Sequence, residues 1–169
     1  MSSIGSTQSR FRRVFRGEFE FVTGLARRLG VRASDTEDVA HEVFVVFFRR
    51  IREYDKTRPV RPWLFGIAVR VASDYRRLAR NARELPFGAC DDAITSARRD
   101  APDAQVLDGE ILRSLEAIPL ERRAVLVMHD LLGYSMPEIA RELEIPLNTG
   151  YTRLRLARDA VQSLAVKWN

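Results

Sequence analysis

Hydrophobic residues recur along most of this chain at intervals of three and four, the spacing of an amphipathic helix rather than a strand. Up to residue 84 this pattern predicts three helices: one that ends near Gly30, one that starts at Asp35 or Thr36, and one that starts near Pro62. The run from Val43 to Phe48 could form a strand by itself, but the helical spacing on both sides outweighs so short a segment.

The segment from about residue 85 to residue 103 interrupts the pattern. It has little periodicity, and its prolines, its glycine and its aspartates favour turns over helix. Helical spacing resumes after it. We therefore predict an all-α protein with two small helical domains, residues 1–84 and 104–169, joined by a flexible acidic linker over residues 85–103.

The second domain contains the signals of a helix-turn-helix. Ser135 precedes Glu138 by three residues, the spacing of a capping box, and Pro137 suits the first turn of a helix. Ile145-Pro146 then breaks that helix, and Asn148 is positioned to cap the next one.

The helix that follows is rich in arginine. Its inward positions are apolar, and its outward positions carry groups that can reach phosphates and base edges: Tyr151, Thr152, Arg155 and Arg158. An ordinary helical hairpin with a polar outer face is the alternative. Two helix starts, a tight turn and a basic second helix together favour binding in the major groove of DNA.

Charge and composition narrow the function further. The formal net charge is +5, and residues 1–84 alone carry +8, with 18 Lys and Arg against 10 Asp and Glu. This excess suggests a polyanionic partner, but charge alone does not decide between such a partner and an ordinary solvated surface. No apolar run is long enough to span a membrane, and no signal peptide is evident. Cys90 is the single cysteine, so we expect a reducing, cytoplasmic location. Neither metal-ligand spacing nor a phosphate loop nor a nucleophile–base pair is present, so we expect no catalytic residues, no metal and no cofactor.

Two further segments of the first domain carry information. One is an acidic helix start followed by aromatic residues, Asp35-Thr36-Glu37-Asp38-Val39-Ala40-His41-Glu42-Val43-Phe44. The other runs from Arg61-Pro62-Trp63-Leu64-Phe65 into a basic cluster at Asp74-Tyr75-Arg76-Arg77-Leu78-Ala79-Arg80. Aromatic rings can stack on unpaired bases while arginines hold the backbone, although core packing is the expected role of either Trp63 or Phe65.

With the helix-turn-helix, these segments make the chain resemble the extracytoplasmic-function class of bacterial sigma factors, which keep only the second and fourth conserved regions. The resemblance runs from about Phe11 to Leu164, and its three motifs occur in the family's order. It implies a factor that directs core RNA polymerase to promoters and assists DNA opening, without an active site of its own. Its implied partners are the β′ and β subunits of the polymerase, promoter DNA and an anti-sigma factor.

The resemblance also implies roles for individual residues. Asp38, His41, Glu42 and Phe44 match the helix that docks on the β′ clamp helices, and the loop from Tyr54 to Arg61 matches the one that captures a flipped base. The residues matching the minus-ten-binding segment are Trp63, Arg70, Arg76, Arg77 and Arg80. Those matching the helix that reads the minus-thirty-five element are Thr149, Tyr151, Thr152, Arg153 and Arg155.

Several positions depart from the family pattern. His41 replaces glutamine, and Arg70 replaces an asparagine of the minus-ten-reading helix. Glu144 replaces the glycine of the turn, where a left-handed backbone would cost a non-glycine residue about 1 kcal/mol. Gly150 replaces a valine-like core residue, with an expected loss of apolar contact. Tyr151 and Leu156 stand where basic residues are usual, so we expect altered or weaker reading of the minus-thirty-five element.

Two other functions remain open at this point. The second domain could act as a stand-alone helix-turn-helix regulator that needs no polymerase and binds palindromic DNA as a dimer. A hydrolytic or transfer enzyme is the third possibility, and the missing catalytic motifs count against it.

Overall fold

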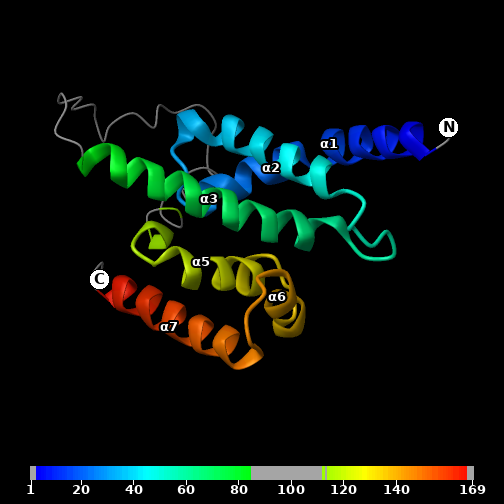
Figure 1. Ribbon diagram of the computed structural model, residues 1–169. Coiled ribbons are helices and arrows are strands. Elements are labelled where there is room, and N and C mark those ends of the chain that lie inside the picture. The colour runs from blue at the N-terminus through cyan, green and yellow to red at the C-terminus, as the bar shows by residue number, and fades with distance from the viewer. Residues whose placement is uncertain (1–2, 85–111, 113, 167–169) are drawn as a thin grey trace, which may run out of the picture.

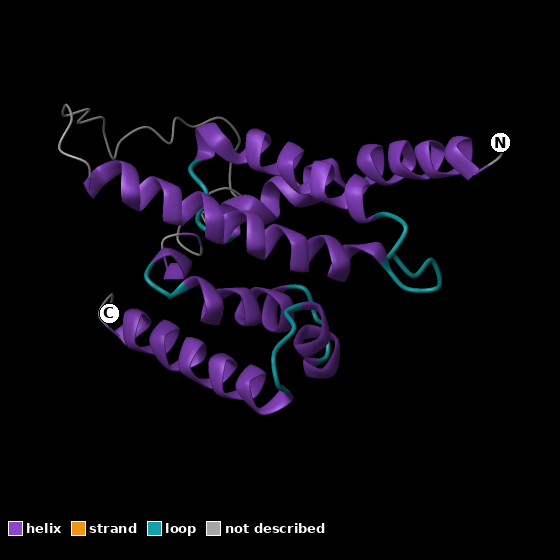
Figure 2. Cartoon of the chain, viewed as in Figure 1, coloured by secondary structure: helices purple, strands orange, loops and turns teal. Residues whose placement is uncertain are grey.

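The computed structural model describes residues 3–84, 112 and 114–166, with side chains described for residues 7–79, 112 and 114–164. All regular elements in these ranges are helical, in agreement with the all-α prediction. The helices form two layers, which we call the first lobe (residues 3–84) and the second lobe (residues 114–166) (Figures 1 and 2). The predicted linker, residues 85–103, lies outside the described residues.

The first lobe consists of three long helices that pack on one another. The three helices expected from the sequence are confirmed, and Gly30 ends the first of them with a positive φ of 89°. The elements in chain order are α1 (Ser3–Arg28), the 3-10 turn η1 (Ala33–Asp35), α2 (Thr36–Arg50) and α3 (Val60–Glu84).

Aromatic rings fill much of the space between α1, α2 and α3. The rings of Phe15 and Phe44 meet edge to face at 4.9 Å, and those of Phe47 and Trp63 at 5.4 Å. Phe65 is fully buried, whereas Trp63 is half-buried at the edge of this core. One of the two aromatics of the Trp-Leu-Phe segment is therefore a core residue, as predicted.

The second lobe contains four shorter elements: α5 (Leu120–Leu126), the π-helical segment η2 (Val127–Leu131), α6 (Met136–Glu142) and α7 (Leu147–Val166). The π-helical segment was not foreseen from the sequence. The N–H of Leu132 bonds to the carbonyl of Val127 at 3.0 Å, and Gly133 ends the segment with a φ of 75°.

A buried arginine holds the turn that leads into α5. Arg123 is 1% exposed, and its guanidinium donates to the carbonyl oxygens of Glu116 and Ile118 at distances of 2.9 to 3.2 Å. Burial, with the nearby charge of Arg76, lowers the pKa of Arg123 to about 10. Sequence spacing alone does not distinguish this arginine from the half-buried Arg122 beside it.

The helix-turn-helix has the predicted capping and turn. The carboxylate of Glu138 accepts hydrogen bonds from the N–H and the hydroxyl of Ser135, at 2.9 and 2.6 Å, which holds the pKa of Glu138 below its usual value. Glu144 adopts the left-handed conformation expected at the turn, with a φ of 55°. The following N–H, that of Ile145, closes the turn on the carbonyl of Ala140 at 2.9 Å.

The start of α7 corrects one prediction. The helix begins at Leu147, and its first bond joins the N–H of Gly150 to the carbonyl of Pro146 at 3.1 Å. Asn148 therefore lies inside the first turn and does not cap the helix. Proline suits this position because its missing N–H would have no helical partner there.

Candidate functional site

One exposed stripe runs along α2 from acidic to apolar residues. Asp38, His41, Glu42, Val45 and Phe48 lie three or four residues apart and are all exposed, so they share one face of the helix. Val45 and Phe48 are 47% and 48% exposed, which is unusual for large apolar side chains. Phe44, in contrast, is 1% exposed and belongs to the aromatic core. Of the four residues expected to dock polymerase, three are on the stripe and Phe44 supports it from beneath.

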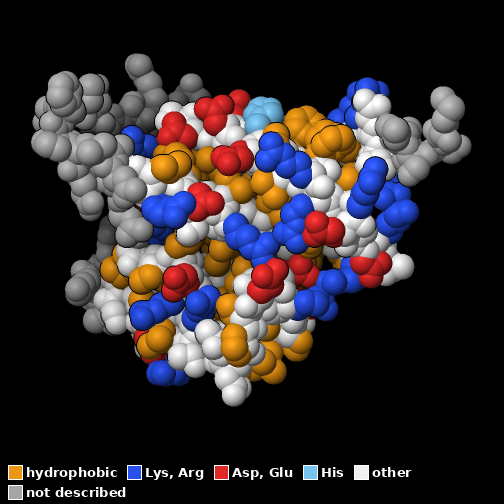
Figure 3. All heavy atoms as spheres, in the orientation of Figure 1, with side chains coloured by type: hydrophobic (Ala, Val, Ile, Leu, Met, Phe, Trp, Pro, Cys, Tyr) orange, Lys and Arg blue, Asp and Glu red, His pale blue; other side chains and the backbone are white. Residues whose placement is uncertain are grey.

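The α2 stripe is held in place by α1. The Nδ1 atom of His41 lies 2.8 Å from the carbonyl oxygen of Glu37, and its ring packs against Phe19 at 4.9 Å. At the apolar end of the stripe, Val45 and Phe48 border a hollow together with Phe11 of α1. Hydrophobic side chains are visible on the surface over α1 and α2 in Figure 3. Sequence reasoning missed Val45 and Phe48, although their helical spacing from Asp38 and His41 places them on the same face.

An aromatic platform lies beside the loop between α2 and α3. The rings of Tyr54 and Trp63 stack with centroids 5.3 Å apart and planes 27° apart. The hydroxyl of Tyr54 donates to the carbonyl of Arg58 within the loop. Asp55 accepts from the N–H and hydroxyl of Thr57, which lowers the pKa of Asp55. The loop is thus an internally bonded turn with a flat aromatic face at its base.

The arginines of α3 do not form one free surface. Trp63, Arg70 and Arg77 are seven residues apart and share a stripe about 21 Å long. Arg77 pairs with Asp74 at 3.2 Å, and Arg70 pairs with Glu144 of the second lobe at 2.7 Å. The Nη1 atom of Arg76 is buried without a hydrogen-bond partner among the described residues. The side chain of Arg80 lies outside the described residues.

The exposed face of α7 contains three of the five predicted residues and one residue that was not predicted. Asn148, Tyr151, Thr152 and Arg155 are exposed at helical spacing, and Tyr151 is 53% exposed. The predicted residues Thr149 and Arg153 are half-buried, and Arg153 lies 3.8 Å from Glu121. Sequence reasoning missed Asn148, because it was assigned to the cap.

Arg158 makes a structural contact within the second lobe. Its Nε and Nη2 atoms donate to the two carboxylate oxygens of Asp130 at 2.9 and 2.6 Å. These bonds, with a contact from His129, lower the pKa of Asp130. Although Arg158 is on the outward face, as predicted from the sequence, it joins α7 to η2.

Gly150 is surrounded by core atoms rather than by a cavity. A Cβ at this position would lie 2.6 Å from the sulfur of Met136, which is 2% exposed. Met136 therefore fills the space of the expected valine-like side chain, and the predicted loss of apolar contact does not occur. The glycine still lowers helix propensity by about 1 kcal/mol.

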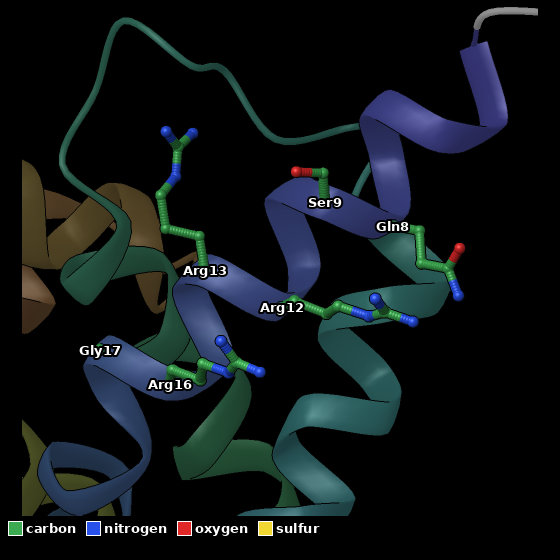
Figure 4. Close-up of a pocket in the computed structure, with 6 residues that line it drawn as sticks. All are labelled: Gln8, Ser9, Arg12, Arg13, Arg16 and Gly17. Atoms are coloured by element: carbon green, nitrogen blue, oxygen red, sulfur yellow. The ribbon is translucent and has the colours of Figure 1, made fainter.

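A basic groove lies along the N-terminal half of α1. It is lined by Gln8, Ser9, Arg12, Arg13, Arg16 and Gly17. Figure 4 shows the guanidinium groups of Arg12 and Arg16 on the same side of α1 as Gln8, and that of Arg13 on the other side. Within the described part of the chain, none of these three arginines forms an ion pair, and a Cβ on Gly17 would meet no atom within 4 Å. In the sequence, only the excess of basic residues in the first half of the chain pointed to this groove.

The described residues contain no group of three or more His, Cys, Asp or Glu side chains that could hold a metal ion. None of the described helices is both long and apolar enough to cross a membrane.

Two family models match this chain, one for each lobe. Sigma-70 region 2 matches residues 15–82, and sigma-70 region 4 matches residues 108–161. The chain is 28% identical over 145 residues to the RNA polymerase sigma factor NccH of Alcaligenes xylosoxydans xylosoxydans, covering 82% of this chain and 77% of that protein. It is 27% identical over 146 residues to the ECF RNA polymerase sigma-E factor of Escherichia coli K12, covering 79% and 75%.

Two solved structures have the same fold. The structure of CnrH in complex with the cytosolic domain of CnrY matches with a TM-score of 0.67 and 24% identity, over 95% of this chain and 90% of that one. The sigma factor RpoE of Bartonella quintana, in complex with the anti-sigma factor NepR, matches with a TM-score of 0.68 and 18% identity, over 92% and 96%. Since both lobes match, and in the family's order, the chain belongs to the sigma-70 family and is an extracytoplasmic-function sigma factor, which directs RNA polymerase to promoters.

Proposed function

We propose that this sigma factor docks on core polymerase through the α2 stripe of Asp38, His41, Glu42, Val45 and Phe48. The observation that carries this proposal is the exposure of two large apolar side chains in line with two carboxylates. An apolar centre flanked by charged groups is typical of a protein interface. A partner helix that is basic at one end and apolar at the other would match the stripe.

We infer that the Tyr54–Trp63 platform and the arginines of α3 bind the opened minus-ten strand. A flat aromatic face can stack on an unpaired base whatever its identity, and stacking contributes about 1–3 kcal/mol per base. Arg70 and Arg77 lie on the platform's side of α3, where they can reach successive phosphates. We also assign to the DNA backbone the arginines of the α1 groove, which form no ion pair among the described residues.

We further infer that α7 reads duplex DNA at the minus-thirty-five element through Asn148, Tyr151, Thr152 and Arg155. Asn can bond both polar atoms of an adenine edge, and Arg both acceptors of a guanine edge. Replacement of the usual basic residues by Tyr151 and Leu156 leaves fewer phosphate contacts, so this element contributes specificity more than affinity.

Three features follow from this role. The factor acts without chemistry of its own, alongside polymerase in the cytoplasm. It also has an anti-sigma partner, since RpoE of Bartonella quintana is seen bound to the anti-sigma factor NepR and CnrH to the cytosolic domain of CnrY. The stand-alone regulator gains no support, because the first lobe matches sigma-70 region 2 and is therefore part of the sigma factor itself.

The proposal is tested by gel filtration with purified core polymerase, followed by run-off transcription from genomic fragments with and without core. We expect a complex with core, and transcripts only when both proteins are present. Absence of a complex would exclude the docking role, and specific duplex binding without core would favour the stand-alone regulator.

A further inference from the structure

A hollow lies where the C-terminal half of α3, the turn after α1 and the turn that leads into α5 come together. Its volume is about 520 Å³, within the range of small-molecule sites, and it is partly open to solvent. Figure 1 shows α5 running beneath α3, and the two helices contact each other. The polar residues that line the hollow include Arg32, Ser73, Arg76, Glu116 and Arg123.

Two arginine side chains meet at this hollow with nitrogen atoms that have no acceptor. Nη1 of Arg76 and Nη1 of Arg123 both lie within 3.5 Å of the point that a Cβ on Gly30 would occupy. Both atoms are buried, and within the described residues neither has a hydrogen-bond partner. The other nitrogens of the Arg123 guanidinium, Nε and Nη2, donate to backbone carbonyls. This guanidinium is therefore held in place with one donor nitrogen left over.

The guanidinium of Arg123 stays charged at neutral pH. Burial, and then the charge of Arg76, lower the pKa of Arg123, but only to about 10. A buried charged donor that has no acceptor and lies beside a like charge is unfavourable on both counts. An anion bound between the two side chains would remove both disadvantages.

The carboxylates that line the hollow do not supply this anion. Glu116 and Glu121 are both exposed, and in the described part of the chain neither forms an ion pair with Arg76 or Arg123. Glu121 lies 3.8 Å from Arg153 instead. The charge of Glu116 acts on Arg123 less strongly than the charge of Arg76 does, so the like charge prevails there.

We propose that the hollow binds a phosphate group, which accepts hydrogen bonds from Arg76 and Arg123 together. Phosphate suits this place because its several oxygens can bond two guanidinium groups at once. Arg32 adds a third positive charge to the lining, and Ser73 lies one turn before Arg76 on the same face of α3. This inference adds a ligand to the sigma factor and does not depend on where the chain contacts polymerase or DNA.

The phosphate group can come from two sources. The volume of the hollow exceeds that of a phosphate ion, so either inorganic phosphate or the terminal phosphate of a small nucleotide fits. Inorganic phosphate and ADP are therefore the two probes. Half-saturation at similar concentrations indicates that the phosphate group alone is bound. Half-saturation by ADP at a concentration at least tenfold lower indicates a nucleotide site.

The test follows thermal unfolding of the full chain as each probe is added, with chloride holding the ionic strength constant. A ligand that binds only the folded protein raises the unfolding midpoint by about 3–6 °C for each tenfold increase above its dissociation constant. Isothermal titration calorimetry measures the same binding directly. We expect the midpoint of the wild type to rise with at least one of the two probes.

Arg76→Gln removes one guanidinium and leaves the bonds from Arg123 to the backbone intact. We expect this variant to lose the response to phosphate and ADP. Without either probe its midpoint should equal or exceed that of the wild type, because a like charge has gone. Arg77→Gln is the matched control on the next residue of α3. Arg77 is exposed and pairs with Asp74 at 3.2 Å, so its loss should leave the response unchanged.

Ser73→Asp supplies the anion from the chain itself. It places a carboxylate three residues before Arg76, as Asp74 already stands three residues before Arg77. We expect a higher midpoint without phosphate and a smaller response to phosphate or ADP.

A wild type that responds to neither probe up to about 10 mM, ten times a millimolar dissociation constant, would overturn the proposal. Equal loss of the response in Arg77→Gln would overturn it too, because the effect would then be one of general surface charge. A lower midpoint in Arg76→Gln with the response intact would show that Arg76 only supports the fold.

Discussion

Gly150 of α7 and Met136 of α6 share one space in the core of the second lobe, since a Cβ on the glycine would lie 2.6 Å from the methionine sulfur. A small residue at one position therefore allows a long residue at the other. This relationship accounts for a glycine near the start of α7, where helix propensity alone disfavours it.

We expect Gly150→Val to destabilise the protein by about 1–3 kcal/mol, because the added atoms overpack the core. Met136→Ala should cost about 2–5 kcal/mol through the cavity it leaves. The double variant should lose less unfolding free energy than the two single variants lose together, and the difference, the coupling energy, should be about 0.5–3 kcal/mol. Urea unfolding of the four proteins measures the cycle, and strictly additive effects would show that the two side chains do not share the space.

The bond between Arg158 and Asp130 should appear in the acid limb of the stability profile. The pKa of Asp130 is lowered in the folded protein, so the contribution of this pair is present above the ordinary aspartate range near pH 4 and is lost as pH falls through the lowered pKa. Arg158→Gln should lower the unfolding free energy by about 0.5–1 kcal/mol at pH 7 and by progressively less toward pH 3. Arg155→Gln, on the exposed face of the same helix, is the control, and a gap as large at pH 3 as at pH 7 would contradict the assignment.

Replacement of Phe48 by alanine should weaken binding to core polymerase by about 1–2 kcal/mol, roughly tenfold, without unfolding the first lobe. Glu42→Lys should weaken it further by reversing a charge on the α2 stripe. Competition against a labelled sigma factor for core polymerase measures both. Glu20→Lys makes the same charge change on α1, and equal weakening by this control would show a general charge effect instead of a docking surface.

Mutations can distinguish the α7 residues proposed to contact DNA from Arg158, whose contact is structural. Arg155→Ala should cost about 1–3 kcal/mol of duplex affinity and relax the preference at one base pair of the minus-thirty-five element. Asn148→Ala should do the same at a neighbouring base pair. Arg158→Ala should leave the base preference unchanged, because its guanidinium is bonded to Asp130. Binding of holoenzyme to a promoter library with randomised minus-thirty-five positions distinguishes these results.

The basic groove of α1 predicts a change in salt dependence. Replacing Arg12, Arg13 and Arg16 together by serine should reduce the slope of log affinity against log salt by roughly 2, since each phosphate contact to a single strand contributes about 0.7. Sequence preference should not change. Titration of holoenzyme with promoter DNA at several salt concentrations measures the slope, and an unchanged slope would exclude the groove from the DNA path.

The elements most reliably predicted from the sequence depend on neighbours in the chain. Ser135 and Glu138 are three residues apart, so their capping bond can be read from spacing, and so can the left-handed turn at Glu144. The cap prediction for Asn148 is wrong because the helix begins one residue earlier, at Leu147, so that Pro146 precedes its first turn and Asn148 lies inside it. Phe44 was included in the docking face because a motif does not distinguish the buried side of a helix from the exposed side. Helical periodicity does make that distinction, and it selects Val45 and Phe48.

Contacts between distant residues could not be predicted in this way. The bond from Arg158 to Asp130 spans 28 residues, and Gly150 and Met136 meet only after α6 and α7 have packed. Arg70 and Glu144 each looked like an isolated departure from the family. Only the docking of the second lobe on α3 shows that they pair.

The exposure of that pair has a consequence for how the protein responds to ions. Glu144 and Arg70 meet at the rim, where their side chains are 70% and 43% exposed, so dissolved salt screens their attraction. Added salt should therefore weaken this contact between the second lobe and α3.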